Sequence, residues 1–425
     1  MRLLSRGLGA RCAFLLVCFY AAAATAATLQ VSTSGSDSNN CLSPAAACRT
    51  IQAAINKAVN GDAINVAPGA YAEILFLSQR ENLTIAGSTG VVITHPGPTA
   101  SPLRSNAFVN RSKNIELRDL RITGTAQLDG VQVFDSIGIR ITRCILEGTG
   151  GAGGALFTGF SDVNIADSTI QDNATGIRVD GNSTVQLGSP QGISTVQRNG
   201  VGVVVRSGAF FLRGPAVVQD NGVGVQGQEG ATIKLCCQQD GKRRIVNNGI
   251  GIAARGASLD LRGPMEMSGN HFSALQMTGG FATITGVPNS ASPGTVIRNN
   301  GSPDTAAIQL FGGTLRLAGI SANDIVISDN AGNGVVLTHN ASATIFNTLV
   351  TGNGADGVRV QGLSSLRLAV TAIVNGNGSS DLFCTQNSYA DGDRGGVQRM
   401  FCPSFEHGHS EDDHGPDDRD PDGGN

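Results

Sequence analysis

Short runs of alternating hydrophobic and polar positions, separated by glycine or asparagine, recur along most of this chain. One unit shows the pattern: Val201, Val203 and Val205 fall on one face, and shorter apolar runs follow at 210–212 and 217–218. A period of two predicts short β-strands with one face turned inward. We therefore expect three strands in each unit, joined by tight turns.

The unit recurs at a nearly constant interval. An apolar residue, two mostly polar residues and an asparagine return from Asn173 to Asn377 at intervals of 22 to 30 residues, with a mean of 25.5. Such a period is typical of a solenoid. A leucine-rich repeat is the main rival, but its leucine-spaced consensus and helical return segment are missing. The sequence thus predicts an all-β solenoid of about a dozen coils, a parallel β-helix.

The recurring asparagines are predicted to form a structural ladder rather than a catalytic set. Asparagine tolerates the left-handed backbone conformation, and its side-chain amide can bond to the same side chain in the next coil. The predicted ladder residues are Asn173, Asn199, Asn221, Asn248, Asn270, Asn300, Asn330 and Asn353.

Residues 1–27 have the layout of a secretory signal peptide. Three arginines accompany an apolar run at 13–20, and the small residues 24–26 suit a cleavage site. The apolar run is too short to cross a bilayer, and no later stretch is long enough. We expect a secreted or periplasmic mature chain without a transmembrane segment.

The rest of the chain divides into four predicted segments. They are an N-terminal cap at 28–62, the parallel β-helix at 63–380, a C-terminal cap at 381–405 and a disordered acidic tail at 406–425. In the N-terminal cap, Ile51, Ile55, Ala58 and Val59 share one face of a predicted amphipathic helix over 50–59, which would cover the open end of the first coil. The tail carries eight acidic residues against one arginine and cannot bury a core.

Seven cysteines follow the predicted signal peptide, and an oxidising compartment favours disulfides. The predicted loop staples at the two ends of the fold join Cys41 to Cys48 and Cys384 to Cys402. Because seven is odd, at least one thiol stays free or pairs between molecules; Cys144 is our candidate, as a small buried residue. The pairing of the neighbouring cysteines 236–237 is left open.

The runs Gly35–Cys41, Cys48–Ile55 and Gly61–Glu73 resemble the opening of secreted proteins of the pectate lyase-like superfamily. With the repeats, this resemblance covers roughly residues 28 to 400. It implies a single-stranded, right-handed parallel β-helix. It leaves the activity open, because the superfamily holds lyases, glycoside hydrolases, epimerases and adhesins.

A lyase of this kind would need clustered acids to hold calcium beside a basic residue, and a hydrolase would need two carboxylates. The densest charged region of the coils supplies the candidates Asp119, Asp129, Asp135, Arg140, Arg143 and Glu147. We favour a structural interpretation, in which Asp129 takes the place of the later asparagine-glycine turns and the other charges solvate a sheet face. No cofactor is predicted, and calcium would serve only a lyase.

A second candidate is the column of residues seven positions after the ladder asparagines: Asp180, Arg206, Gln228, Arg255 and Met277. Asp180 and Arg206 would be neighbours on adjacent coils, and we expect them to pair across the strands. Arg206 and Arg255 could instead hold an acidic sugar. We favour the structural interpretation here too.

Composition sets the expected class of partner. Outside the signal peptide and tail the formal charge is about +1, which argues against nucleic acid. Only 4% of residues are aromatic, which weakens glycan processing, and His95, His271 and His339 are isolated. We predict binding or scaffolding of an extracellular polysaccharide or cell-envelope component. The alternative is a polysaccharide lyase or glycoside hydrolase acting on an acidic glycan.

Overall fold

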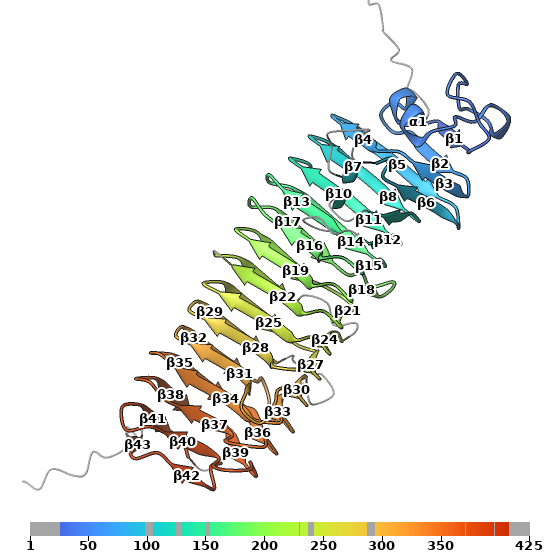
Figure 1. Cartoon of the computed structure of the whole chain (residues 1–425). Helices are drawn as coiled ribbons and strands as arrows, with labels where there is room; N and C mark the ends of the chain where they lie inside the picture. The colour runs from blue at the N-terminus through green and yellow to red at the C-terminus, as the bar shows by residue number, and fades with distance from the viewer. Residues whose placement is uncertain are drawn as a thin grey trace, which may run out of the picture.

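Three parallel sheets run the length of an elongated molecule (Figure 1). The computed structural model describes residues 26–407, apart from 98–104, 125–128, 149–153, 229, 237–241, 287–293, 370 and 395. We call the sheets A, B and C in the order in which the chain visits them. Two short helices, η1 (Pro44–Ala46) and α1 (Ile51–Lys57), precede the first complete coil.

The strands of each sheet follow one another at every third place in the chain. Sheet A contains β1 (Thr28–Val31), β2 (Ala63–Val66), β5 (Glu81–Gly87), β8 (Lys113–Arg118), β11 (Ile139–Thr142), β14 (Asp162–Ala166), β17 (Thr184–Leu187), β20 (Ala209–Leu212), β23 (Thr232–Leu235), β26 (Ser258–Arg262), β29 (Phe281–Thr285), β32 (Thr314–Ala318), β35 (Ser342–Phe346), β38 (Ser365–Leu368), β41 (Tyr389–Gly392) and β43 (Phe405–His407). Sheet B contains β3 (Gly69–Ala72), β6 (Val91–Thr94), β9 (Arg121–Thr123), β12 (Ile145–Glu147), β15 (Thr169–Gln171), β18 (Ser194–Gln197), β21 (Ala216–Gln219), β24 (Arg243–Val246), β27 (Met265–Ser268), β30 (Thr295–Arg298), β33 (Ile325–Ser328), β36 (Thr348–Thr351) and β39 (Ile373–Asn375). Sheet C contains β4 (Leu75–Ser78), β7 (Ser105–Asn110), β10 (Asp129–Phe134), β13 (Ala155–Thr158), β16 (Thr175–Val179), β19 (Val201–Arg206), β22 (Val223–Gln228), β25 (Ile250–Arg255), β28 (Ser273–Thr278), β31 (Ala306–Phe311), β34 (Asn333–Thr338), β37 (Val358–Val360), β40 (Leu382–Cys384) and β42 (Met400–Phe401).

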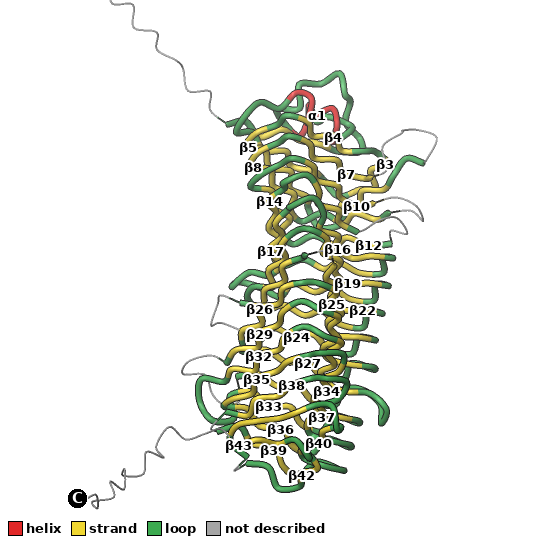
Figure 2. Tube along the Cα trace, turned by 90° about the vertical axis from the view of Figure 1, so that its left-hand side faces the viewer, coloured by secondary structure: helices red, strands yellow, loops and turns green. Residues whose placement is uncertain are grey.

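Each coil crosses sheets A, B and C and then returns to sheet A one strand further along the stack (Figure 2). The described strands form thirteen three-strand coils, from β2–β3–β4 to β38–β39–β40. Strands of neighbouring coils pair in parallel, as β16 does with β19 and β19 with β22. The predicted right-handed parallel β-helix of about a dozen three-strand coils is confirmed.

The core consists of aliphatic columns that run through the stack. The register aligns Ile177, Val203 and Val225 on three successive coils, and all three side chains are fully buried. Burying a side chain of this size contributes about 1.5–3 kcal/mol. Gly202, directly before Val203, is explained by a close contact between backbones. A Cβ at this position would lie 2.5 Å from the carbonyl oxygen of Gly224 on the next coil. The Val-Gly-Val pattern therefore encodes both a core column and a close backbone approach.

Helix α1 covers the N-terminal end of the stack. It buries Ile51, Ala54 and Ile55 and contacts β1, β2 and β4. The predicted helix included Thr50, which is the N-cap, and extended two residues too far at its other end, because Ala58 takes an extended backbone (φ −63°, ψ 140°) and Val59 is 60% exposed.

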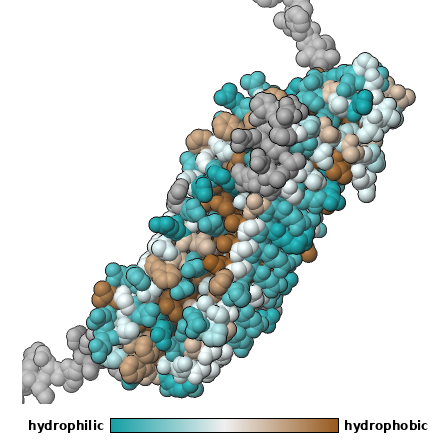
Figure 3. Space-filling view, in the orientation of Figure 1, coloured by the Kyte–Doolittle hydropathy of each residue, from teal (hydrophilic) through white to brown (hydrophobic). Residues whose placement is uncertain are grey.

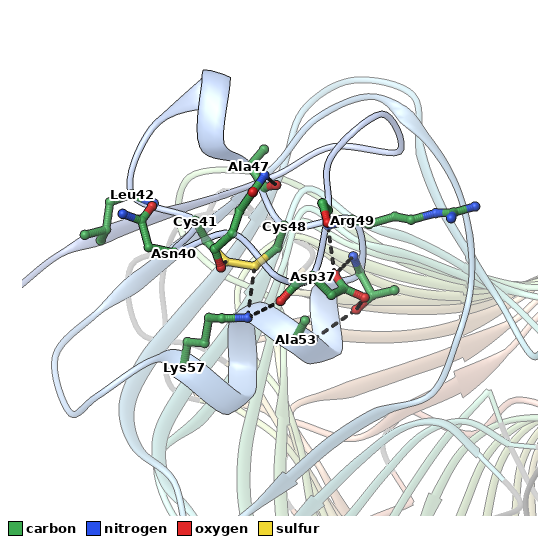
Figure 4. The surroundings of a disulfide bond; sticks show 12 residues. Asp37, Asn40, Cys41, Leu42, Ala47, Cys48, Arg49, Ala53 and Lys57 are labelled. Carbon is green, nitrogen blue, oxygen red and sulfur yellow. Dashed lines mark hydrogen bonds between the residues drawn. A yellow bond between two sulfur atoms is a disulfide. The ribbon is translucent and has the colours of Figure 1, made fainter.

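The Cys41–Cys48 disulfide holds the loop that lies beside α1 (Figure 4). Nζ of Lys57, the last residue of α1, donates to the carbonyl oxygen of Asp37 at 2.7 Å. The carboxylate of Asp37 accepts the backbone N–H groups of Arg49 and Thr50 at 2.9 and 2.8 Å. The staple therefore closes a loop that is also tied to the start and the end of the helix.

At the other end, the sheets continue beyond residue 380, where the sequence predicted the coils to stop. β40 and β41 still pair with β37 and β38, and the predicted disulfide joins Cys384 to Cys402. Glu406 and His407 belong to β43, inside the segment predicted as a disordered tail. The predicted signal peptide up to residue 25, and the tail from residue 408, lie outside the described residues.

Two remaining predictions concern the cysteines and the membrane. Cys144 is free and buried, as expected. Cys237 lies outside the described residues, so the predicted ambiguity at 236–237 stays open. Within the part of the chain that the structure describes, no helix combines the length and apolarity needed to span a bilayer.

The turn between sheets B and C carries the asparagine ladder. From Asn173 to Asn353, Nδ2 of each ladder asparagine donates to Oδ1 of the asparagine one coil further on, at 2.8–3.1 Å. The series continues to Asn377. One predicted reason was wrong: the residue before each asparagine, such as Arg198 (φ 52°), takes the left-handed conformation, and the ladder asparagines do not. The side-chain amide alone explains the choice of asparagine.

Candidate functional site

The charged residues predicted as catalytic candidates lie on different sides of the coil. Asp119 and Arg143 occupy turns between sheets A and B, Asp135 a turn between sheets C and A, and Arg140 the exposed face of sheet A. Glu147 ends a strand of sheet B. The described residues contain no group of three or more His, Cys, Asp or Glu side chains that could hold a metal ion. These charged residues are close in sequence, but the fold does not bring them together into one site.

Asp119 and Arg143 form one exposed ion pair on adjacent coils. Nε and Nη2 of Arg143 donate to the two carboxylate oxygens of Asp119, both at 2.7 Å. The hydrogen-bonded carboxylate of Asp119 raises the pKa of Arg143 above its ordinary value. With half of the Arg143 side chain exposed, such a pair contributes at most about 1 kcal/mol. It orders two turns and leaves neither group free for proton transfer.

Glu147 terminates a second ladder, which is built from glutamines on the outer face of sheet B. Nε2 of Gln171 donates to Oε2 of Glu147 at 2.9 Å, and Gln197 and Gln219 continue the series at the same distance. Arg121 pairs with the other carboxylate oxygen of Glu147. The Glu147 side chain is only 10% exposed, so its carboxylate is occupied by structural partners.

Asp129 does not stand where the sequence predicted. Pairing of Val131 with Ala155, and onward through Ile177 to Val203, aligns Asp129 with Val201. That position is the first residue of a sheet C strand, two residues after the ladder asparagine Asn199. Asp129 is 6% exposed. The prediction of a turn residue was wrong, because similarity of the Asp-Gly and Asn-Gly dipeptides misaligned the coil by two.

A depression lies on the outer face of sheet C, which faces the viewer in Figures 1 and 3. Its volume is about 580 Å³. It crosses β22, β25 and β28, and its polar lining residues are Gln226, Gln228, Arg255, Gln276 and Thr278. Alternation brings these side chains outward, because residues such as Val225 and Leu275 on the same strands enter the core. The lining offers amides, a hydroxyl and a guanidinium, but no carboxylate.

Aromatic side chains extend the same face in both directions. At the N-terminal end, Phe76 of β4 stacks on Phe108 of β7 with ring centroids 5.7 Å apart. At the C-terminal end, Phe383 of β40 stacks on Phe401 of β42 at 5.3 Å. Phe76 is 41% and Phe401 57% exposed. Figure 3 shows apolar residues in a broken line along this face. A chain poor in aromatics therefore concentrates several of them on one surface.

The predicted column of residues seven positions after the ladder asparagines is partly confirmed and partly wrong. Arg206 pairs in register with Gln228, and Gln228 lies beside Arg255. The next residue in the column is Thr278, because Asn270 is followed by one extra residue before its strand begins. Met277 is fully buried in the core.

The expected partner of Asp180 was also wrong. Its carboxylate binds Nε of Arg178, two residues earlier on the outward face, at 2.7 Å. Nε of Arg206 is buried and has no hydrogen-bond partner among the described residues. Neither Arg206 nor Arg255 forms an ion pair with a described carboxylate. Both cations are therefore available to an external anion.

Sequence reasoning missed most of this surface. Gln226 and Gln276 were not singled out, and the phenylalanines of sheet C were counted only as a small total. The sequence did contain a signal. Three glutamines each stand between two buried positions of one strand, and must therefore point outward: Gln226, Gln276 and Gln309. Aligning the strands by their inward residues, rather than by the asparagines, would have brought these outward side chains together.

No protein-family model and no curated protein sequence matches the chain. Among solved structures, the mannuronan C-5 epimerase AlgE4 A-module of Azotobacter vinelandii is similar at 14% identity and a TM-score of 0.43, over 82% of this chain and 91% of that one. The GH136 lacto-N-biosidase from Eubacterium ramulus aligns at 10% identity and a TM-score of 0.41, over 89% of this chain and 67% of that one. Tailspike protein 3 of bacteriophage CBA120 aligns at 12% identity and a TM-score of 0.40, over 81% of this chain and 54% of that one. Likenesses this distant assign no activity to the chain, and its class, a parallel β-helix protein, rests on its own three-sheet coil.

Proposed function

We propose that this protein binds an extended polysaccharide along the outer face of sheet C. The depression over β22, β25 and β28 carries this proposal, because it combines three glutamine amides, a threonine hydroxyl and an arginine in one polar surface. Amides and hydroxyls both donate and accept hydrogen bonds. They are thus suited to the hydroxyl groups that cover a sugar ring.

The shape of the face suits a linear polymer. Neighbouring strands lie about 4.8 Å apart, so the fourteen strands of sheet C present a surface roughly 60 Å long. Exposed rings at its ends, Phe76 and Phe401, offer flat apolar surfaces to the apolar faces of sugar rings. A polymer lying along the stack axis would meet aromatic contacts at both ends and hydrogen-bonding groups in the middle.

The chemistry of the depression favours binding over cleavage. A glycoside hydrolase needs two carboxylates that flank the scissile bond, and the lining contains none. The charged candidates on other faces are engaged elsewhere, as Asp119 is with Arg143 and Glu147 with Arg121. A lyase or hydrolase acting on an acidic glycan remains the alternative from the sequence, and no cluster of acidic side chains among the described residues favours it.

The location of this binding is part of the proposal. The signal-peptide pattern at 1–27 predicts export, and two disulfides close loops at the ends of the stack. Disulfides form and persist mainly in oxidising compartments. We therefore infer that the ligand is an extracellular or cell-envelope glycan, which the protein holds along its long axis.

Affinity electrophoresis through gels containing neutral or acidic polysaccharides tests the proposal. We expect at least one polysaccharide to retard the mature chain. Combining Gln226→Ala with Gln276→Ala in one variant should lower the apparent affinity for that polysaccharide about tenfold. Gln186→Ala is the matched control, since Gln186 has the same partial burial but lies on the outer face of sheet A. Equal losses in both variants, or no retardation by any polysaccharide, would remove the proposal. New reducing ends, followed in parallel, would favour the enzymatic alternative.

A further inference from the structure

Polar and charged residues alternate along the outermost column of sheet C. The register places Arg206, Gln228, Arg255 and Thr278 on four successive coils. A cation therefore stands on every second coil, with an amide between the two cations. At about 4.8 Å per coil, the two arginines are separated by about 10 Å along the stack.

The cationic stretch has defined ends. On the coil before Arg206 the column holds Asp180, which repels an anion although Arg178 partly neutralises it. On the coil after Thr278 the column holds Phe311, which cannot bind an anion. The column therefore offers two cationic positions. An anionic group is repelled on one side of them and finds no cationic partner on the other.

Arg255 also borders the depression on this surface. Together with Gln228 it lines this depression, which has a volume of about 580 Å³. Arg206 is partly buried, with an unpartnered Nε, and a guanidinium held in this way has donors to spare for a carboxylate or sulfate. An oxyanion beside either guanidinium would thus pair with its charge.

We propose that this column selects a polysaccharide that carries one acidic group on every second sugar residue. The spacing of one coil is close to the length of one sugar residue in an extended chain. Acidic groups on alternate residues would face Arg206 and Arg255, and the neutral residue between them would meet the amide of Gln228. This inference rests on the proposed binding along sheet C, and it adds the charge pattern of the ligand.

Competing ligands separate this pattern from simple attraction between opposite charges. The probes are size-matched oligosaccharides of hyaluronan, with a carboxylate on every second residue, of polygalacturonate, with one on every residue, and a neutral 1,4-linked glucan. In titration calorimetry at physiological salt, we expect hyaluronan oligosaccharides to bind the mature chain about tenfold more tightly than either alternative. A sulfated alternating glycan, added as a fourth probe, tells whether carboxylate or sulfate is preferred.

Three variants locate the effect. Arg206→Gln and Arg255→Gln should each weaken binding of the alternating glycan about tenfold, equivalent to 1.4 kcal/mol. Binding of the neutral glucan should fall much less, because that probe carries no charge to pair with either arginine. Gln228→Arg should reverse the preference towards polygalacturonate, because every coil from β19 to β25 would then carry a cation. Arg140→Gln is the control, since Arg140 is an exposed outward arginine on sheet A.

The outcomes distinguish the two proposals. If no oligosaccharide binds, binding along sheet C is overturned and the inference falls with it. If the alternating, uniformly charged and neutral probes bind equally, and the arginine variants match the control, binding along sheet C stands and the charge pattern is refuted. A gain for polygalacturonate in Gln228→Arg alone, with losses for the alternating glycan in the two arginine variants, supports both.

Discussion

Asn377 donates its backbone N–H and its side-chain Nδ2 to the same oxygen of Asp381, at 3.1 and 3.0 Å. Every earlier asparagine of the ladder makes this pair of bonds with an asparagine one coil further on, so the last one needs a different acceptor. Asp381 supplies it from the following loop, and its second oxygen accepts the backbone N–H of Arg399 at 2.8 Å. A buried carboxylate thus completes a column of amides.

The glutamine ladder on sheet B ends by the same rule in the opposite direction. Its amides donate toward the N-terminal end, from Gln219 to Gln197 to Gln171, so the first glutamine is the one that needs a foreign acceptor. Glu147 provides it. A carboxylate closes each ladder at the end toward which the amide donors point, since a carboxylate only accepts hydrogen bonds.

Removing the carboxylate of Asp381 should loosen the C-terminal coils. Asp381→Ala leaves the backbone N–H groups of Asn377 and Arg399 without their acceptor, and hydrogen bonds to charged groups contribute about 1.5–3 kcal/mol. We expect the free energy of opening β39 and β40 to fall by about 3 kcal/mol, measured by native-state hydrogen exchange. Asp304→Ala, at an exposed turn residue, should change it by less than about 0.5 kcal/mol. Equal protection in both variants would contradict the role of Asp381.

The same carboxylate should make these coils sensitive to acid. Burial by itself raises the pKa of Asp381, but hydrogen bonds from Asn377 and Arg399 outweigh burial and hold this pKa below its ordinary value. A group whose pKa is lowered by folding stabilises the protein above its unfolded-state pKa, about 3.9, and this stabilisation disappears as the pH falls through the lower, folded-state value. The stability difference between the wild type and Asp381→Asn, from urea denaturation, should therefore be constant above about pH 5 and shrink below about pH 4. A constant difference down to pH 2 would show that folding does not lower the pKa of Asp381.

Within the ladder, a single alanine should cost more than the loss of one bond. Asn248 is 1% exposed; it accepts from Nδ2 of Asn221 and donates to Oδ1 of Asn270. Asn248→Ala also leaves the buried backbone N–H of Asn221 without its acceptor and removes the amide donor to the carbonyl oxygens of Val218 and Val246. We therefore expect a loss of about 3 kcal/mol in unfolding free energy. Asn164→Ala, an outward residue of sheet A, serves as the control. Similar urea midpoints for both variants would show that water replaces the ladder.

The repeat was readable from the sequence because its period and its asparagines both come from backbone constraints. Each coil must bury a turn between sheets B and C, and an amide side chain solves that problem in the same way each time. The reason for the left-handed backbone was assigned to the wrong residue. It belongs to the preceding one, such as Asp220 (φ 55°), where aspartate, arginine, asparagine and glycine all occur.

The candidate site could not be located by counting along the chain, because coil length varies. One extra residue after Asn270 moved Met277 from the surface column into the core, and a shift of two misaligned Asp129. Which outward residues become neighbours depends on pairing between coils, which the inward aliphatic residues set. Charged residues that are close in sequence, such as Asp135 and Arg143, were instead dispersed to different turns of the coil.

Glu147 offers the sharpest test between a structural and a catalytic role for the charged region. Glu147→Gln keeps an oxygen that accepts from Gln171 but loses the ion pair with Arg121, so unfolding free energy should fall by about 1 kcal/mol and glycan binding on sheet C should not change. Glu81→Gln, at an exposed residue of sheet A, is the matched control. Both variants and the wild type should be compared with polygalacturonate, with and without calcium, for new reducing ends and unsaturated ends. A product that the wild type and Glu81→Gln form, but Glu147→Gln does not, would make Glu147 a catalytic residue; the ladder geometry leads us to expect that the three proteins behave alike.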